Sequence, residues 1–67
     1  MTAPTRRVAR FSVEKMRIFS TTDRYVAFMV NDLRTRNPQA TEREILEWVY
    51  NSTVKEDKHL KKAYLLI

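Results

Sequence analysis

Apolar residues recur at spacings of three and four in the second quarter of the chain, on one stripe of an amphipathic helix. The stripe consists of Tyr25, Val26, Met29, Val30 and Leu33. Asp23 or Thr22 can cap the helix start, because a short polar side chain can accept a hydrogen bond from a first-turn backbone N–H. Pro38 ends it, since the residue before a proline is pushed out of helical geometry. The pattern predicts a helix over residues 23–36, with Phe28 outside the apolar stripe.

A capping signal precedes the next apolar run. Thr41 and Glu44 have the Thr-x-x-Glu spacing of a capping box, in which each side chain accepts a hydrogen bond from the backbone of the other residue. The apolar residues that follow occupy about half of a helix circumference. They are Ile45, Leu46, Trp48, Val49 and Tyr50. The pattern predicts a helix over residues 42–52 that packs against two neighbours.

The same spacing returns at Thr53 and Glu56, which predicts that a third helix starts at once and covers residues 54–66. One face of this helix is apolar, with Leu60, Ala63, Tyr64 and Ile67. The opposite face collects the basic residues Lys55, Lys58, His59 and Lys62 at spacings of three, four and seven.

The segment before these helices fits two structures. Ser12 can cap a short helix, but in the sequence KMRIF the basic residues Lys15 and Arg17 alternate with Met16 and Ile18, as in a half-buried strand. Periodicity leaves both structures open for residues 12–20. We expect the basic and polar residues 1–11 to form a flexible arm, because they lie at a terminus. The whole pattern predicts one small all-α domain of three or four helices over residues 12–67.

Composition agrees with a helical fold. The chain has 67 residues, no glycine and no cysteine. Without glycine, phosphate-cradling loops and tight hairpins are disfavoured, and without cysteine there are no disulfides. A structural zinc is also not expected, because there is only one histidine. A domain this short buries little core, so we expect helical packing or a homodimer to add stability.

The chain shows no apolar stretch long enough for a signal peptide or a membrane-spanning helix. We therefore expect a soluble intracellular protein, in the cytoplasm or nucleoid, with no membrane partner. The absence of cysteine fits a reducing compartment.

Positive charge is concentrated at the two ends. The net charge is +5. Residues 1–22 carry five basic and one acidic side chain, residues 23–53 carry four and five, and residues 54–67 carry four and two. This distribution suits an anionic partner that both ends contact, either nucleic acid or an acidic protein surface.

Catalysis is not expected. His59 is the only histidine, there is no thiol, and no serine or threonine lies in a nucleophile motif. The glutamates at positions 42, 44 and 47 are more simply explained as a solvated helix face, and a helical domain of this size has little room for a water-excluding cleft. We expect no enzyme activity and no cofactor.

Two consecutive helices joined by a short turn are similar to a helix-turn-helix. In that arrangement, Lys55, Lys58 and Lys62 can each meet a phosphate, and His59 can reach a phosphate or a base edge. A flexible N-terminal arm can enter the minor groove with its three arginines, Arg6, Arg7 and Arg10. The first interpretation is a small regulator or accessory factor that binds nucleic acid, with DNA favoured over RNA. A lysine face that is merely solvated fits the same pattern.

If KMRIF is a strand, residues 15–54 are similar to a ribbon-helix-helix regulator, in which paired strands of a dimer enter the major groove. The resemblance implies that Lys15 and Arg17 point at bases. The sequence departs from that family because the usual glycine between the helices is missing and Phe19 and Ser20 break the strand alternation.

Three aromatic residues support a different function. Phe28 lies off the stripe of its helix, and Trp48 and Tyr50 lie at the two edges of theirs. The N-terminal segment can cover them with its own apolar residues Phe11, Ile18 and Phe19, in which case they belong to the core. If it does not, they form a dimer interface or a partner site. The alternative interpretation is a protein-interaction module, an adaptor or inhibitor of the kind that phages and plasmids encode.

Overall fold

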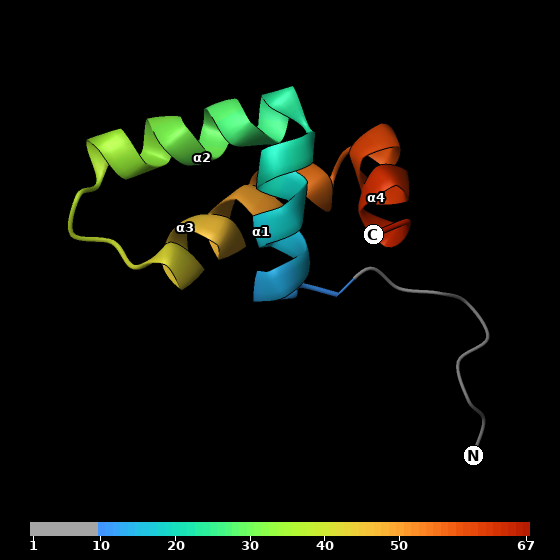
Figure 1. Ribbon diagram of the computed structural model, residues 1–67, viewed down its shortest axis with the longest axis horizontal. Coiled ribbons are helices and arrows are strands. Elements are labelled where there is room, and N and C mark those ends of the chain that lie inside the picture. The colour runs from blue at the N-terminus through green and yellow to red at the C-terminus, as the bar shows by residue number, and fades with distance from the viewer. Residues whose placement is uncertain (1–9) are drawn as a thin grey trace, which may run out of the picture.

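The computed structural model describes residues 10–67, which form a compact set of helices (Figure 1). Over these residues the chain has no strand, and the predicted all-α fold is confirmed. The elements in order are α1 (Val13–Thr22), α2 (Arg24–Arg36), α3 (Glu42–Val49), the π-helix η1 (Tyr50–Val54) and α4 (Lys58–Leu65). Residues 1–9 of the predicted arm lie outside the described part of the chain.

The segment whose structure the periodicity left open is the helix α1. Ser12 caps it, with an extended backbone and a side-chain oxygen that accepts a 3.3 Å hydrogen bond from the N–H of Lys15. Met16 and Phe19, three residues apart, are buried, whereas Ile18 is 49% exposed. A strand would have placed Met16 and Ile18 on the same face. The ribbon-helix-helix resemblance is therefore wrong, because this segment is not a strand.

Two of the predicted helix starts are confirmed. The Asp23 carboxylate accepts a 3.0 Å hydrogen bond from the N–H of Val26 at the start of α2. At the start of α3 both hydrogen bonds of the capping box form, from the N–H of Thr41 to Glu44 at 2.9 Å and from the N–H of Glu44 to Thr41 at 3.2 Å. Local sequence chemistry therefore determines where α2 and α3 begin.

The predicted start of the last helix is wrong. Thr53 does not cap it, because its hydroxyl donates a 2.6 Å hydrogen bond back to the carbonyl of Val49 and the residue is buried within η1. Asp57 is the cap, and one of its carboxylate oxygens accepts hydrogen bonds from the N–H groups of His59 at 2.9 Å and Leu60 at 3.0 Å. The helix therefore begins at Lys58 rather than at residue 54.

The core lies where α1 crosses α2 and α3, and α4 packs against η1 and α1 at the other end of the molecule (Figure 1). Its buried side chains come from all five elements. They are Met16, Phe19, Val26, Val30, Ile45, Leu46, Val49, Tyr50, Val54 and Tyr64. Among the residues that the structure describes, no helix combines the length and the apolar character that crossing a bilayer requires.

Candidate functional site

The outer face of α4 presents basic side chains to solvent. Lys58, His59 and Lys62 are exposed, as is Lys61 beside them. Within residues 10–67, none of these side chains takes part in a hydrogen bond or an ion pair. Lys55 is exposed too, but it lies in the turn before α4 and not on the helix. The predicted lysine face therefore exists as a shorter helical face with Lys55 beside it.

Two leucines lie at the C-terminal end of this basic face. Leu65 is 37% exposed and Leu66 is 82% exposed. Leu65 follows Lys61 by four residues and Lys58 by seven, so the three lie along one side of the helix. We name this surface the α4 face, and it consists of Lys58, His59, Lys61, Lys62, Leu65 and Leu66.

Lys15 and Arg17, which would point at bases if their segment were a strand, instead contact residues of α4 and α3. The ammonium nitrogen of Lys15 lies 4.6 Å from the ring centroid of Tyr64, over the aromatic face. Arg17 donates two hydrogen bonds to the carboxylate of Glu42 at the start of α3, at 2.9 and 2.6 Å. These hydrogen bonds lower the pKa of Glu42 and raise that of Arg17. The strand on which a base-reading geometry for Lys15 and Arg17 depended does not form, and a role of the two residues in nucleic-acid binding stays a prediction.

The predicted arginine arm is only partly visible. Arg6 and Arg7 lie outside the described residues. Arg10 is exposed, and its carbonyl accepts a 2.6 Å hydrogen bond from the hydroxyl of Tyr64. The backbone at residue 10 is therefore attached to α4, on the side of the helix opposite its lysines.

The three aromatic residues proposed as a partner site are not together. Tyr50 is 4% exposed and lies in the core, where its ring centroid is 5.4 Å from that of Tyr64 and 5.7 Å from that of Phe11. Its burial raises the pKa of its hydroxyl. The expectation that Tyr50 is exposed to a partner is wrong, because Phe11 and α4 cover that edge of the helix. Phe28 is 65% exposed and Trp48 is 52% exposed, on α2 and α3 respectively.

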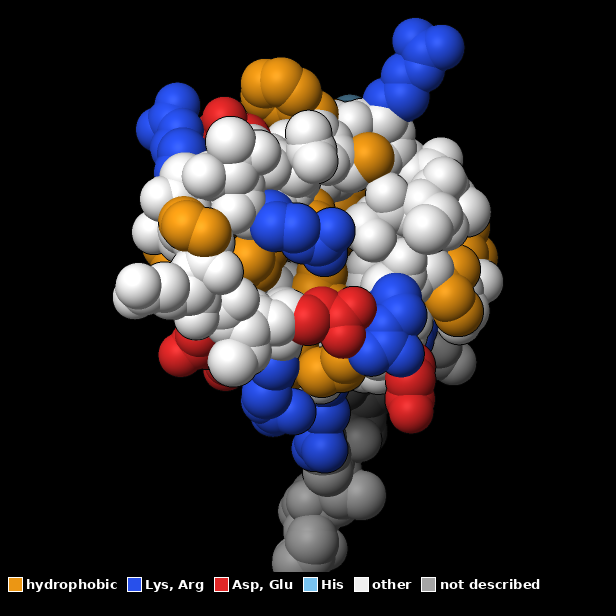
Figure 2. Space-filling view, turned by 60° about the vertical axis from the view of Figure 1, so that its left-hand side comes forward, with side chains coloured by type: hydrophobic (Ala, Val, Ile, Leu, Met, Phe, Trp, Pro, Cys, Tyr) orange, Lys and Arg blue, Asp and Glu red, His pale blue; other side chains and the backbone are white. Residues whose placement is uncertain are grey.

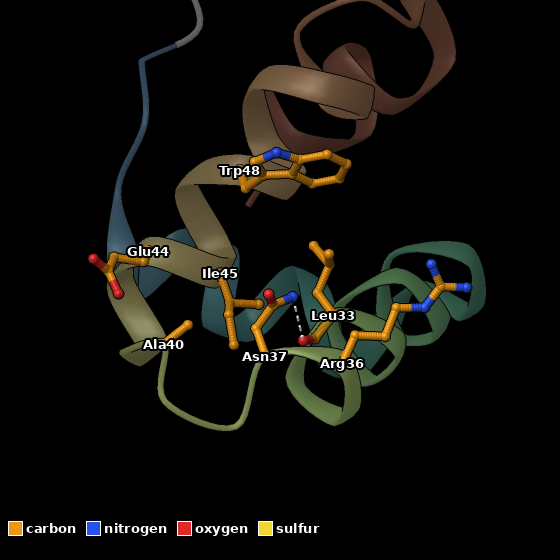
Figure 3. Close-up of a pocket in the computed structure, with 7 residues that line it drawn as sticks. All are labelled: Leu33, Arg36, Asn37, Ala40, Glu44, Ile45 and Trp48. Atoms are coloured by element: carbon orange, nitrogen blue, oxygen red, sulfur yellow. Dashed lines mark hydrogen bonds between the residues drawn. The ribbon is translucent and has the colours of Figure 1, made fainter.

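A groove of about 550 Å³ lies between the end of α2, the loop that follows and α3. Its lining residues are Leu33, Arg36, Asn37, Ala40, Glu44, Ile45 and Trp48. In Figure 3 the side chains of Leu33 and Trp48 face each other across the groove, with Ile45 to the side of Leu33. Arg36 and Glu44 point outward at its two ends (Figure 3). We name this site the α2–α3 groove.

The walls of the α2–α3 groove are mainly apolar, and the side chains around it are charged. On one side, the Nε atom of Arg36 lies 3.4 Å from the carboxylate of Asp32. On the other, Glu44 and Glu47 are exposed one turn apart on α3. The face turned to the viewer in Figure 2 shows hydrophobic side chains in hollows among basic and acidic ones. The groove is suited to an apolar side chain flanked by positive charge.

Sequence reasoning identified Trp48 as a candidate but not the groove around it. Leu33 belongs to the apolar stripe of its predicted helix and Ile45 to the apolar arc of the next, and in the structure Leu33 is half-buried and Ile45 buried. The groove is formed jointly by the end of α2, the loop that follows and α3, and the periodicity of one helix does not show how two helices pack. Phe28 does not line it.

The described residues contain no group of three or more histidine, cysteine, aspartate or glutamate side chains that could hold a metal ion. The described residues form two candidate binding surfaces, which are a basic face on α4 and an apolar groove with an acidic side on α3. The chain matches no protein-family model, no curated protein and no solved structure.

Proposed function

We propose that this protein binds nucleic acid through the α4 face, as a small regulator or accessory factor in the cytoplasm or nucleoid. One observation carries the proposal. Lys58, Lys61 and Lys62 are exposed and have no ion pair within residues 10–67, whereas Lys15 and Arg17 are engaged in intramolecular contacts. A lysine that has no protein partner can neutralise a phosphate and release its counterion, which drives association.

The proposed contacts are to the phosphate backbone. Lys58 and Lys62 lie one turn apart, and Lys61 and Lys55 extend the positive surface on either side. The imidazole of His59 can form a hydrogen bond to a phosphate or a base edge. Because charge supplies most of this affinity, we expect binding to DNA of many sequences and a strong dependence on salt.

Fluorescence anisotropy of labelled duplex DNA, titrated with protein over a series of salt concentrations, tests the proposal. The logarithm of the affinity should fall linearly with the logarithm of the salt concentration. In the double variant Lys58→Glu with Lys62→Glu, binding should be lost, or its salt slope should be smaller by about two because two phosphate contacts are gone.

The matched control is Arg24→Glu with Arg34→Glu on α2. Both arginines are exposed, and the net charge changes by the same amount. This control should retain most of the affinity. An equal loss in both double variants would show that net charge and not the α4 face controls binding, and an absence of binding at low salt would overturn the proposal.

A second candidate function is a protein-interaction module, an adaptor or inhibitor, and the α2–α3 groove favours it. A half-exposed tryptophan in the wall of an apolar groove is typical of a site that contributes strongly to a protein interface. Phe28 adds exposed apolar area elsewhere on α2.

An environment-sensitive dye that binds apolar surface, anilinonaphthalene sulfonate, tests whether the groove binds apolar groups. Dye fluorescence should increase and saturate with the wild-type protein, and Trp48→Ala should remove most of the increase. Phe28→Ala is the matched control, because it removes an exposed aromatic side chain outside the groove. Equal dye binding by all three proteins would rule out the groove as a binding site.

A further inference from the structure

Two exposed apolar features of the protein do not contact each other. The α2–α3 groove lies at the end of the molecule that carries the connection between α2 and α3, whereas α4 lies at the other end (Figure 1). No residue of α4 lines the groove, because α4 packs against η1 and α1. The leucines of the α4 face therefore cannot enter the groove of their own chain.

The chemistry of these two features is complementary. Leu65 and Leu66 offer two exposed branched side chains next to three lysines. The groove offers apolar walls at Leu33 and Trp48, and the outer side of α3 carries two acidic residues next to them, Glu44 and Glu47. The nearby cation, Arg36, is paired with Asp32 and so adds little net positive charge.

We propose that the α2–α3 groove receives Leu65 and Leu66 from a second copy of this chain, so that copies associate head to tail. This inference rests on the groove being the protein-interaction site proposed above. Lys58 and Lys61 of one copy then face Glu44 and Glu47 of the next. Because the two surfaces in contact are different, an open pair keeps one unused groove and one unused α4 face, and further copies can add.

The protein contains its own reporter for this contact. Trp48 is the only tryptophan of the chain, and it lies in the wall of the groove with half of its surface exposed. As the protein concentration rises, we expect its emission to move to shorter wavelength, because the indole leaves water. Over the same range, the mass from sedimentation velocity should rise from the 8.0 kDa of the monomer to at least twice that value.

Two variants that each lack one half of the contact test its head-to-tail geometry. Leu65→Asp with Leu66→Asp keeps the groove and Trp48, and Trp48→Ala keeps the leucines. All three side chains are exposed, so the substitutions leave the core intact, and circular dichroism checks this. Each variant alone should remain at 8.0 kDa. Mixed together they should form a 1:1 pair, and the remaining Trp48 should shift to shorter wavelength.

The matched control is Phe28→Asp, which places the same charge at an exposed apolar position outside both surfaces and should associate like the wild type. Two results overturn the inference. One is a wild-type protein that stays at 8.0 kDa, with constant Trp48 emission, at every concentration. The other is a wild-type protein that associates while the two variants fail to pair, since that outcome indicates a symmetric interface.

Dye binding separates this inference from the proposal on which it rests. If the wild type does not associate but Trp48→Ala loses the dye, the groove remains a binding site for another partner and only self-association is excluded. If the dye does not bind either, both the protein-interaction role and this inference are wrong.

Discussion

The hydroxyl of Tyr64 donates a 2.6 Å hydrogen bond to the carbonyl of Arg10, 54 residues earlier in the chain. The Tyr64 ring is fully buried, with its centroid 6.0 Å from that of Phe19 and 5.4 Å from that of Tyr50. One side chain therefore attaches α4 to the start of the domain and also contributes to its core. This makes Tyr64 the most direct test of how α4, which carries the proposed binding face, is held in place.

Tyr64→Phe retains the ring and removes only the hydroxyl. The free energy of unfolding should fall by about 1 kcal/mol, because the Arg10 carbonyl loses its partner. Tyr64→Ala should cost more, about 3–5 kcal/mol, because it also empties the core position. Urea unfolding followed by circular dichroism measures both. Tyr25→Phe, at an exposed position, is the control and should unfold like the wild type. A Tyr64→Phe variant as stable as the wild type would contradict the role of this hydrogen bond.

Stability should decrease at alkaline pH. Burial raises the pKa values of Tyr50 and Tyr64 in the folded state above the ordinary tyrosine value of about 10. The folded state therefore keeps these protons when the unfolded state loses them. Their stabilising effect is fully present below the unfolded pKa and is lost as pH rises toward the folded values. Urea unfolding at increasing alkaline pH measures the decrease.

Comparison with Tyr→Phe variants assigns this pH dependence. The decrease should be shallower in Tyr50→Phe and in Tyr64→Phe, because each lacks one titrating hydroxyl. Tyr25→Phe should leave the slope unchanged, since Tyr25 is exposed. Identical slopes in all variants would mean that the buried tyrosines are not responsible.

The capping box at the start of α3 should contribute measurably to stability. Thr41→Ala removes the oxygen that accepts from the N–H of Glu44, and the free energy of unfolding should fall by about 1 kcal/mol. Thr35→Ala provides the comparison, because the Thr35 hydroxyl only donates back to the carbonyl of Asn31 within α2. That change should be neutral or slightly stabilising, since alanine favours helices. Equal effects of the two changes would argue against the capping box.

The stabilising effect of the ion pair between Arg17 and Glu42 should depend on salt concentration and on pH. Arg17→Ala should lower the melting temperature at low salt and have a smaller effect at high salt, because both side chains are exposed. The pKa of Glu42 is lowered in the folded state by its hydrogen bonds to Arg17. Its stabilising effect is therefore present above the unfolded carboxyl pKa and is lost as pH falls through the folded value. Arg24→Ala, at an exposed position without an ion pair in residues 10–67, should show neither dependence.

The small core should tolerate truncation poorly. Leu46 is almost fully buried, and Leu46→Ala should reduce the free energy of unfolding by about 2–5 kcal/mol. A single core in a domain of this size rarely supplies more than about 3–5 kcal/mol, so this variant should be largely unfolded at room temperature. Ile18→Ala removes a side chain of equal size at a half-exposed position and should keep the fold. A cooperatively folded Leu46→Ala variant with wild-type stability would disprove this account of the core.

The two Thr-x-x-Glu patterns show why local sequence predicts some helix starts and not others. At Thr41 the chain is exposed and extended, so the threonine oxygen can accept from the next turn. At Thr53 the neighbouring residues Tyr50 and Val54 are buried, which keeps the backbone helical through η1 and turns the hydroxyl back to Val49. The two sequences are equivalent locally, and tertiary packing distinguishes them.

Trp48 in α3 and Tyr50 at the start of η1 show the same limit for the candidate site. Trp48 and Tyr50 lie at opposite edges of one apolar arc, and the pattern leaves open for both whether they belong to the core or to a partner site. Phe11 and Tyr64 cover Tyr50, whereas no described ring contacts Trp48. The lysines of α4 were predicted from spacing alone, because one helix determines their relative positions, but the groove depends on two helices and their angle. Which edge is covered follows from the path of the whole chain.

The π-helix η1 contains one residue more than a regular α-helix needs over the same path. The N–H of Lys55 donates to the carbonyl of Tyr50, five residues earlier, at 2.8 Å. A π turn holds about one residue more than an α turn, and here the additional residue lies among exposed positions such as Asn51 and Ser52. Loss of one of these residues would let α3 continue as a regular helix while the buried side chains on either side keep their neighbours. Positions 51 and 52 are therefore where this domain can lose one residue with the least disturbance of its core.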